Sequence, residues 1–314
     1  MMQPMQKIVQ ALKQNIARVV VGRDEAIELM LCALICRGHV LIEDVPGVGK
    51  TRLIAAIAKS IDCSFRRIQF TADVLPSDVT GFSVYNQKTG DFEFKPGAIM
   101  SQLVLADEIN RTSPKTQAAL LEAMEEAHVT VDGVTYEMEK PFMVLATQNP
   151  IEFLGTFQLP EAQLDRFFMK ISIGYPGKED ESAVLNMHQL RDPFLDLEAV
   201  ATAEDIIKIQ QEVKKVFVHD TLNDYIVSIV SATRNHPSIM LGASPRASIS
   251  LYRAAQATAY LAGRDYVVPD DIQKMVGPVV AHRIVLGQEM RFNNTTAEDL
   301  VAEILKSIPV PTGK

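Results

Sequence analysis

A lysine and a threonine follow two closely spaced glycines in the stretch "EDVPGVGKT", residues 43–51. The letters before it suit a buried strand, and those after it have the apolar spacing of a helix. A tight loop between a strand and a helix N-terminus points backbone N–H groups at an anion. We therefore predict a phosphate-binding loop in which Lys50 reaches the phosphates and Thr51 binds Mg²⁺. The other residues expected to line the bound group are Pro46, Gly47, Val48 and Gly49.

The loop departs at one position from the strict pattern G-x-x-x-x-G-K-[ST]. Asp44 stands where that pattern has glycine. We expect Asp44 to lie at the end of the strand, before the part of the loop that wraps phosphate. The loss of glycine flexibility is then tolerable, and the role of Asp44 itself stays open.

Two adjacent carboxylates end another apolar run, "LVLADE", at Asp107 and Glu108. Neighbouring side chains on a strand point in different directions, so the two acids can serve two purposes. We expect Asp107 to hold Mg²⁺, directly or through water, and Glu108 to orient and deprotonate an attacking water.

Three further polar residues suit work on a γ-phosphate. Asn149 ends the apolar run "VLATQN" and can bind the γ-phosphate or the attacking water, with Thr147 as the next choice. Arg166 precedes the last apolar run, and Arg246 begins a helical segment near the C-terminus. An arginine beside the γ-phosphate stabilises transition-state charge, but spacing alone does not choose between these two.

Strand-like and helical patterns alternate over the first half of the chain, which predicts an α/β domain with a mostly parallel sheet. Ser113 is placed to cap the helix expected over 113–127. Two segments, 81–97 and 128–138, alternate around turn-like letters and predict inserted β-hairpins. The expected strands are the runs 39–44, 65–70, 103–108, 142–149 and 167–173.

The pattern changes after the Gly- and Pro-containing stretch 174–181, which reads as a linker. Beyond it only helical periods are found, so we expect a core domain over 1–176 and an all-helical domain over 177–314. Thr295 and Glu298 fit a capping box for the last helix. The expected helices are 203–216, 219–235, 244–262, 268–282 and 295–307.

Composition narrows the class of protein. The chain has 314 residues, 47% of them hydrophobic, and a formal net charge of −8, which argues against a protein that coats nucleic acid or anionic membrane. Three cysteines form no disulfide framework, and Cys32 and Cys36 read as small buried helix residues rather than metal ligands. No secretory signal or membrane span is recognisable, so we expect a soluble cytoplasmic protein.

Taken in order, these motifs resemble those of the AAA+ ATPases, and the resemblance covers nearly the whole chain. "PGVGKT" corresponds to Walker A, "LVLADE" to Walker B, Asn149 to sensor 1, Arg166 to the arginine finger and Arg246 to sensor 2. The wording of "EDVPGVGKT", "LADEINRTSPKTQAALLEAMEE" and "LPEAQLDRF" is similar to the MoxR family in particular, in which an Asp at position 44 is unremarkable.

The resemblance implies ATP and Mg²⁺ as cofactors and a ring, usually a hexamer, with both hairpins facing the pore. It places Val21 and Gly22 near adenine, and Arg111 near the subunit interface. Arg166 would act on a neighbour's ATP, whereas Arg246 would read the nucleotide of its own chain. The implied partners are a protein substrate and a separate protein with a von Willebrand factor A domain.

Two other functions share the same ATPase site. One is a nucleic-acid motor or loader, since relatives with such hairpins include replicative helicases. That reading needs basic hairpin tips, whereas 128–138 offers acids and 86–90 offers a single lysine, Lys88. The other is the ATPase subunit of a metal-chelatase-like complex, which would differ mainly in its partner.

Overall fold

The structure is a computed structural model. It describes residues 4–45, 47–149, 156–187, 192–292 and 295–311. Pro46, which the sequence places in the phosphate-binding loop, lies outside the described residues.

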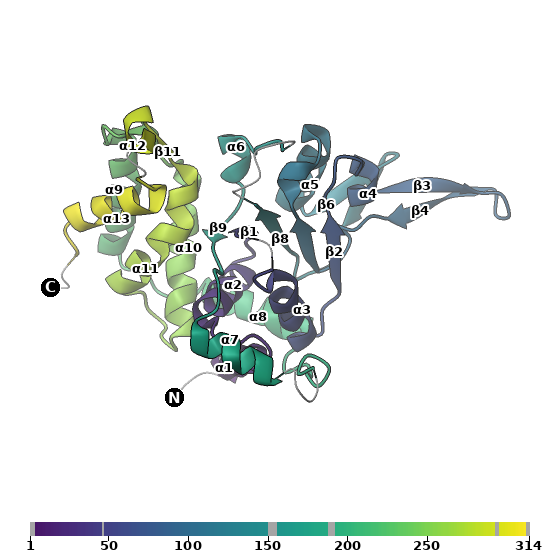
Figure 1. The fold of residues 1–314 in the computed structure, drawn as a ribbon, viewed down its shortest axis with the longest axis horizontal. Helices are drawn as coiled ribbons and strands as arrows, with labels where there is room; N and C mark the ends of the chain where they lie inside the picture. The colour runs from purple at the N-terminus through teal and green to yellow at the C-terminus, as the bar shows by residue number, and fades with distance from the viewer. Residues whose placement is uncertain (1–3, 46, 150–155, 188–191, 293–294, 312–314) are drawn as a thin grey trace.

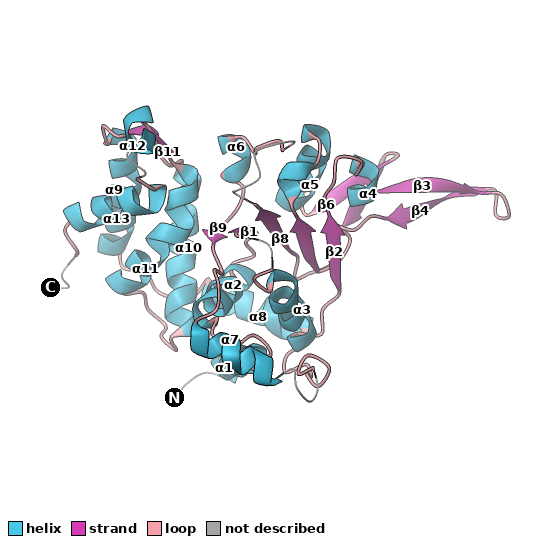
Figure 2. Ribbon diagram, viewed as in Figure 1, coloured by secondary structure: helices cyan, strands magenta, loops and turns pink. Residues whose placement is uncertain are grey.

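Five parallel strands form the central sheet, in the order β2-β5-β8-β1-β9 (Figures 1 and 2). Each coincides with a run predicted as a strand and is slightly shorter than that run. The carboxyl ends of β1, β5 and β8 lie side by side, which gathers the polar residues that follow them. The bounds are β1 Val40–Glu43, β2 Phe65–Gln69, β5 Leu103–Asp107, β8 Met143–Gln148 and β9 Met169–Ile171.

Both faces of this sheet are covered, which explains why its strands read as continuous apolar runs. Leu103 and Leu105 of β5 pack into a core with helices α1 (Pro4–Ala17), α2 (Asp24–Ile35), α3 (Lys50–Ser60) and α8 (Ala203–Val213). Val104 and Ala106 face the opposite side, where they share a second core with α5 (Pro114–Glu126). Ser113 caps α5 as expected, accepting the Thr116 N–H.

Both predicted hairpins are present as inserts outside the main sheet. β3 (Gly81–Asn86) and β4 (Asp91–Pro96) follow the short helix α4 (Pro76–Thr80) and project far from the body (Figure 1). β6 (His128–Val131) and β7 (Val134–Glu137) turn at Asp132 and Gly133, both with positive φ, as a tight hairpin requires. The rings of Phe94 and Tyr136 stack with centroids 3.9 Å apart and so join the two hairpins.

The C-terminal region is helical, as predicted, and packs beside the β9 edge of the sheet (Figure 2). It departs from an all-helical domain in one respect, because β10 (Ile239–Leu241) and β11 (Val285–Leu286) form a small antiparallel ribbon. The sequence did not predict α1 or α12, nor the short helices α4 and α6. The remaining helices are α7 Lys178–Met187, α9 Asp220–Asn235, α10 Pro245–Leu261, α11 Pro269–Val280, α12 Gln288–Phe292 and α13 Ala297–Ser307, with the short helix α6 at Glu161–Leu164.

The capping box of the last helix lies one residue later than predicted. Thr296, not Thr295, is in an extended conformation and accepts the backbone N–H of Asp299, whose carboxylate accepts the Thr296 N–H. Glu298 is not available for the cap because it pairs with Lys170 at 3.0 Å. The sequence alone could not decide between the two positions, because Thr295 with Glu298 and Thr296 with Asp299 have the same spacing.

Cys32 and Cys36 are small buried residues of a helix, α2, as predicted. The Cys36 thiol contacts the Arg253 carbonyl. Over the described ranges, no group of His, Cys, Asp and Glu side chains could hold a metal ion in the manner of a cluster site. Within the same ranges, no helix is long and apolar enough to cross a bilayer.

His39, directly before β1, contacts β8 of the same sheet and α5 of the layer beside it, and its burial predicts an acid-sensitive fold. Its Nδ1 accepts the Val144 N–H at 2.9 Å, and its Nε2 lies 2.9 Å from the Met124 carbonyl oxygen. Exclusion of water lowers the pKa of His39 to about 4, despite the opposing hydrogen bond to Met124. The native ring is therefore neutral at pH 5, whereas an unfolded chain has already bound a proton there.

We expect stability that is complete above about pH 6.5 to fall as the pH drops toward 4, because the unfolded state then binds more protons. His39 alone should cost about 2 kcal/mol between pH 7 and pH 5. The measurement is the urea-unfolding free energy at both pH values for the wild type and His39→Gln. His282 also has a lowered pKa but is present in both chains, so the difference isolates His39. Equal losses in the two chains would remove His39 as the sensor.

Candidate active site

Residues 44, 45 and 47–49 lie between β1 and α3, where the phosphate-binding loop is expected. Gly47 and Gly49 have φ of 87° and 88°, and a Cβ added at either would meet nothing within 4 Å. The backbone thus needs glycine for its conformation and leaves open space beside it. Gly49 caps α3 without a side-chain hydrogen bond, so the N-terminus of α3 is open to an anion. Lys50 Nζ lies 3.1 Å from the Asp44 carbonyl oxygen.

One cavity of about 380 Å³ is lined by candidate catalytic residues that follow three separate strands of the sheet. Lys50 and Thr51 enter it from α3, Asp107 and Glu108 from the end of β5, and Asn149 from the end of β8. These residues are up to about a hundred positions apart in the chain and meet because parallel strands end at one edge. The remaining lining residues are Asp44, Gly47, Gly49, Arg52, Arg67, Gln69 and Thr147.

Thr147 orients both acids. Its hydroxyl donates to Asp107 Oδ1 at 2.6 Å and accepts the Glu108 N–H at 2.8 Å. Glu108 adopts a left-handed conformation with φ of 57°, which is strained for a non-glycine residue outside a turn, and such strain clusters at functional sites. The bend falls at the residue directly after β5, so the strand alternation ends between the two acids.

Two residues of β2, which the sequence did not single out, contact these acids. Arg67 donates to Asp107 Oδ2 at 2.6 Å, and Gln69 donates to Glu108 Oε2 at 2.8 Å. Arg111 also donates to Glu108 Oε2, at 2.9 Å. Arg67 and Gln69 are two residues apart in β2, so their side chains lie on the same face of the strand. This spacing in "FRRIQF" is the pattern from which the pair could have been predicted.

The oxygens of Thr51 and Asp107 are hard ligands of the kind that Mg²⁺ prefers, and both line the cavity that Lys50 enters. Lys50 and the α3 N-terminus supply the positive charge that a polyphosphate needs. The residues present therefore fit a magnesium–triphosphate group. A metal ion on Asp107 would share that carboxylate with Arg67.

A second pocket, of about 330 Å³, adjoins the first through Gly47, Gly49 and Arg52. Its wall is mostly apolar, as a base would need, and it contains the predicted Val21 and Val48. Gly22 lines a different pocket, and a Cβ there would come 2.2 Å from the Asp180 carboxyl, so its smallness serves the packing of α7. The sequence missed the other lining residues, which are Val19, Val20, Arg23, Arg52, Tyr175, Pro176, Glu181, Val184 and Pro193.

The two candidate arginines lie together, away from the phosphate-binding loop. Arg166 Nε is 3.2 Å from one oxygen of Glu125, and Arg246 is 2.7 Å from the other. They line a cavity of about 270 Å³ that shares no residue with the two pockets at the loop. Arg246 thus lines neither pocket at the loop of its own chain, and the expectation that it reads that chain's nucleotide stays a prediction.

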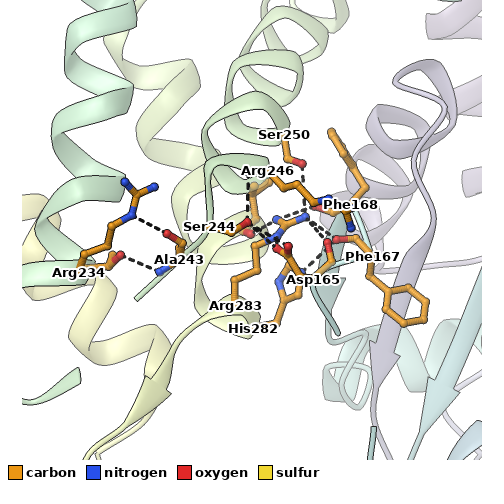
Figure 3. Close-up of polar contacts among 12 residues, drawn as sticks. Asp165, Phe167, Phe168, Arg234, Ala243, Ser244, Arg246, Ser250, His282 and Arg283 are labelled. Atoms are coloured by element: carbon orange, nitrogen blue, oxygen red, sulfur yellow. Dashed lines mark hydrogen bonds and ion pairs between the residues drawn. The ribbon is translucent and has the colours of Figure 1, made fainter. Parts of the chain in front are cut away.

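A polar network joins Asp165 to Ser244 and Arg283, near the start of the helix that carries Arg246 (Figure 3). Asp165, next to Arg166, accepts the Ser244 hydroxyl at 2.9 Å and Arg283 Nε at 2.9 Å. Ser244 in turn caps the helix that carries Arg246. Burial lowers the pKa of Arg283 to about 10 although Asp165 opposes the shift, so the guanidinium stays charged at neutral pH.

Two protein-family models and several known proteins are similar to this chain. Residues 39–169 match the model of the ATPase family associated with various cellular activities (AAA), and 231–304 match the AAA lid domain. The uncharacterized Bacillus subtilis protein YeaC is 55% identical, with 95% of this chain and 93% of that protein aligned. Chaperone MoxR1 of Mycobacterium tuberculosis is 39% identical, with 95% of this chain and 81% of that protein aligned.

Two further matches agree. Protein MoxR of Methylorubrum extorquens is 31% identical, with 95% of this chain and 94% of that protein aligned. The crystal structure of a candidate ATPase from Cytophaga hutchinsonii superposes with a TM-score of 0.92 at 39% identity, covering 98% of this chain and 96% of that one. The chain belongs to the MoxR family of AAA+ ATPases.

Proposed function

We propose that this protein hydrolyses ATP in a Mg²⁺-dependent reaction. The observation that carries the proposal is the single cavity into which Lys50, Thr51, Asp107, Glu108 and Asn149 all project. In this assignment Lys50 holds the β- and γ-phosphates, and Thr51 and Asp107 hold the metal. Glu108 takes a proton from the attacking water, and Asn149 positions that water or the γ-phosphate. Bound Mg²⁺ supplies charge neutralisation between the phosphates.

We further propose that the reaction needs a second copy of the chain. Arg166 and Arg246 line a cavity separate from the loop of their own chain and carry the positive charge that a γ-phosphate transition state requires. A neighbour in a ring would present its nucleotide to this face. Both arginines then act in trans, and a hexameric ring is the assembly we favour.

The energy of hydrolysis is proposed to remodel or assemble a partner protein. One similar protein carries the name Chaperone MoxR1. The projecting β3–β4 hairpin supports a polypeptide partner, because Phe92 and Tyr85 are 73% and 53% exposed and pack edge to face. The hairpin tip, residues 86–90, carries only one basic side chain, that of Lys88, which disfavours a protein that tracks along DNA. A separate protein with a von Willebrand factor A domain is a proposed partner.

The test is phosphate release from ATP by the wild-type chain and by Lys50→Ala. We expect turnover that requires Mg²⁺ and falls about 100-fold or more in the variant, because a preorganised charge on the phosphates is lost. Lys59→Ala, at the other end of the same helix, is the matched control and should keep its turnover. Unchanged hydrolysis in Lys50→Ala would assign any activity to a contaminant or another site.

A further inference from the structure

Asp44, the residue at which the loop departs from the strict pattern, has a buried carboxylate with a defined set of partners. The residue is 6% exposed. Its Oδ1 accepts the Ser172 hydroxyl at 2.9 Å and the Gly174 N–H at 3.1 Å, and its Oδ2 accepts the Ile173 N–H. Burying a carboxylate is costly unless hydrogen bonds replace its water. Three donors from three consecutive residues meet that need.

The two ends of Asp44 face different parts of the site. Its backbone carbonyl is the oxygen that Lys50 Nζ contacts at 3.1 Å, so the main chain belongs to the phosphate-binding loop. Its side chain faces the segment 172–174, which follows β9 and lies 128 or more residues away in sequence. A glycine at this position would complete the strict pattern but could make none of the side-chain contacts.

The segment that Asp44 holds leads directly into the apolar pocket. Tyr175 and Pro176, the next residues, line it together with Val19, Val20 and Val21. Arg23 lines the same pocket and donates to the carbonyl oxygens of Gly174 at 2.7 Å and Tyr175 at 2.9 Å. The wall of the pocket is thus held at one point by Arg23 and at another by Asp44.

We propose that Asp44 is a positioning residue for the nucleotide base: it fixes the 172–176 wall to the phosphate-binding loop so that both halves of one nucleotide are bound at once. The inference rests on the proposed function, because it takes the adjoining pockets as the base and phosphate halves of one ATP site. Binding of an intact nucleotide depends on Asp44, and binding of a bare phosphate chain, which uses only the loop, does not.

The experiment compares two probes on the full chain by calorimetric titration, a non-hydrolysable ATP analogue and inorganic tripolyphosphate, each with Mg²⁺. In Asp44→Asn an NH₂ group replaces one carboxylate oxygen, so whichever way the amide turns it opposes the Ile173 N–H or the Gly174 N–H and leaves that group without an acceptor. We expect this variant to bind the ATP analogue about 10-fold more weakly, the effect of losing one charge-assisted hydrogen bond, and Asp44→Gly, which loses all three, to bind it at least as weakly. Tripolyphosphate should bind within about twofold of the wild type.

Two further variants protect the test against a general loss of structure. Asp271→Asn alters an equally buried acid, 4% exposed, which pairs with Arg264 in the lid and should leave both probes unaffected. Ser172→Ala removes only one donor, so it decides the matter if the Asp44 variants do not fold. It should weaken the ATP analogue about threefold and spare tripolyphosphate.

Equal loss of both probes in the Asp44 and Ser172 variants, or no loss of either, overturns the inference. An equal effect of Asp271→Asn on the ATP analogue does the same, because the loss is then one of general stability. A wild-type chain that binds neither probe instead overturns the proposed function, so the two failures are distinguishable.

Discussion

Glu108→Gln is expected to lower kcat for ATP about 10²- to 10⁴-fold while ATP stays bound, because a general base is worth that range and an amide cannot accept the proton of water. The shape of the site should survive, since Gln can still accept from Gln69 and Arg111 on its remaining oxygen. Single-turnover hydrolysis and nucleotide titration measure the two effects separately.

The matched control for this variant is Glu126→Gln, which removes an exposed glutamate at the end of α5 outside the cavity. It should hydrolyse ATP like the wild type. Retained turnover in Glu108→Gln would remove Glu108 as the base and leave its strained backbone without a catalytic reason. A variant that neither binds nor hydrolyses ATP would assign Glu108 a binding role instead.

Arg166→Ala and Arg246→Ala should each reduce hydrolysis about 10³- to 10⁵-fold, as expected for arginines that stabilise the transition state from a neighbouring chain. Each should then recover activity when mixed with Glu108→Gln, itself inactive. In the mixture the Glu108→Gln chain supplies its intact arginines to a nucleotide held by a chain with an intact Glu108. The measurement is phosphate release across a series of mixing ratios.

Arg246 is the informative member of this pair. If it served the nucleotide of its own chain, every chain with an intact Glu108 would lack it, and no ratio would restore activity. Lys208→Ala, at an exposed position on α8, should change neither activity nor complementation. Recovery for Arg166→Ala but not for Arg246→Ala would contradict the proposal that Arg246 acts in trans. Arg246 would then serve the nucleotide of its own chain.

Most of the chemistry was predictable from sequence because it lies at the ends of buried strands. Lys50, Asp107 and Asn149 each follow an apolar run, and parallel strands bring such ends to one edge whatever the strand order. The order β2-β5-β8-β1-β9 itself was not predictable, since runs buried on both faces carry no information about their neighbours.

The residues that were missed have identifiable physical reasons. Arg67 lies within the run 65–70, which was predicted as a strand, but the strand pattern does not show that its side chain contacts Asp107. Tyr175 lay within a segment assigned as linker because Gly and Pro flank it. The place of Arg246 depends on how the helical region packs on the β9 edge, which no local pattern encodes.

The stacked rings of Phe94 and Tyr136 fix one end of the projecting hairpin, so a rotation at that end would move the whole hairpin. The stack couples β4 to β7 near the hairpin base, and α4, just before that base, packs on α5. A six-residue strand extends about 20 Å, so a rotation of about 10° at the base carries the tip through about 3.5 Å. A rotation at the base would therefore displace the exposed Tyr85 and Phe92 further than the base itself.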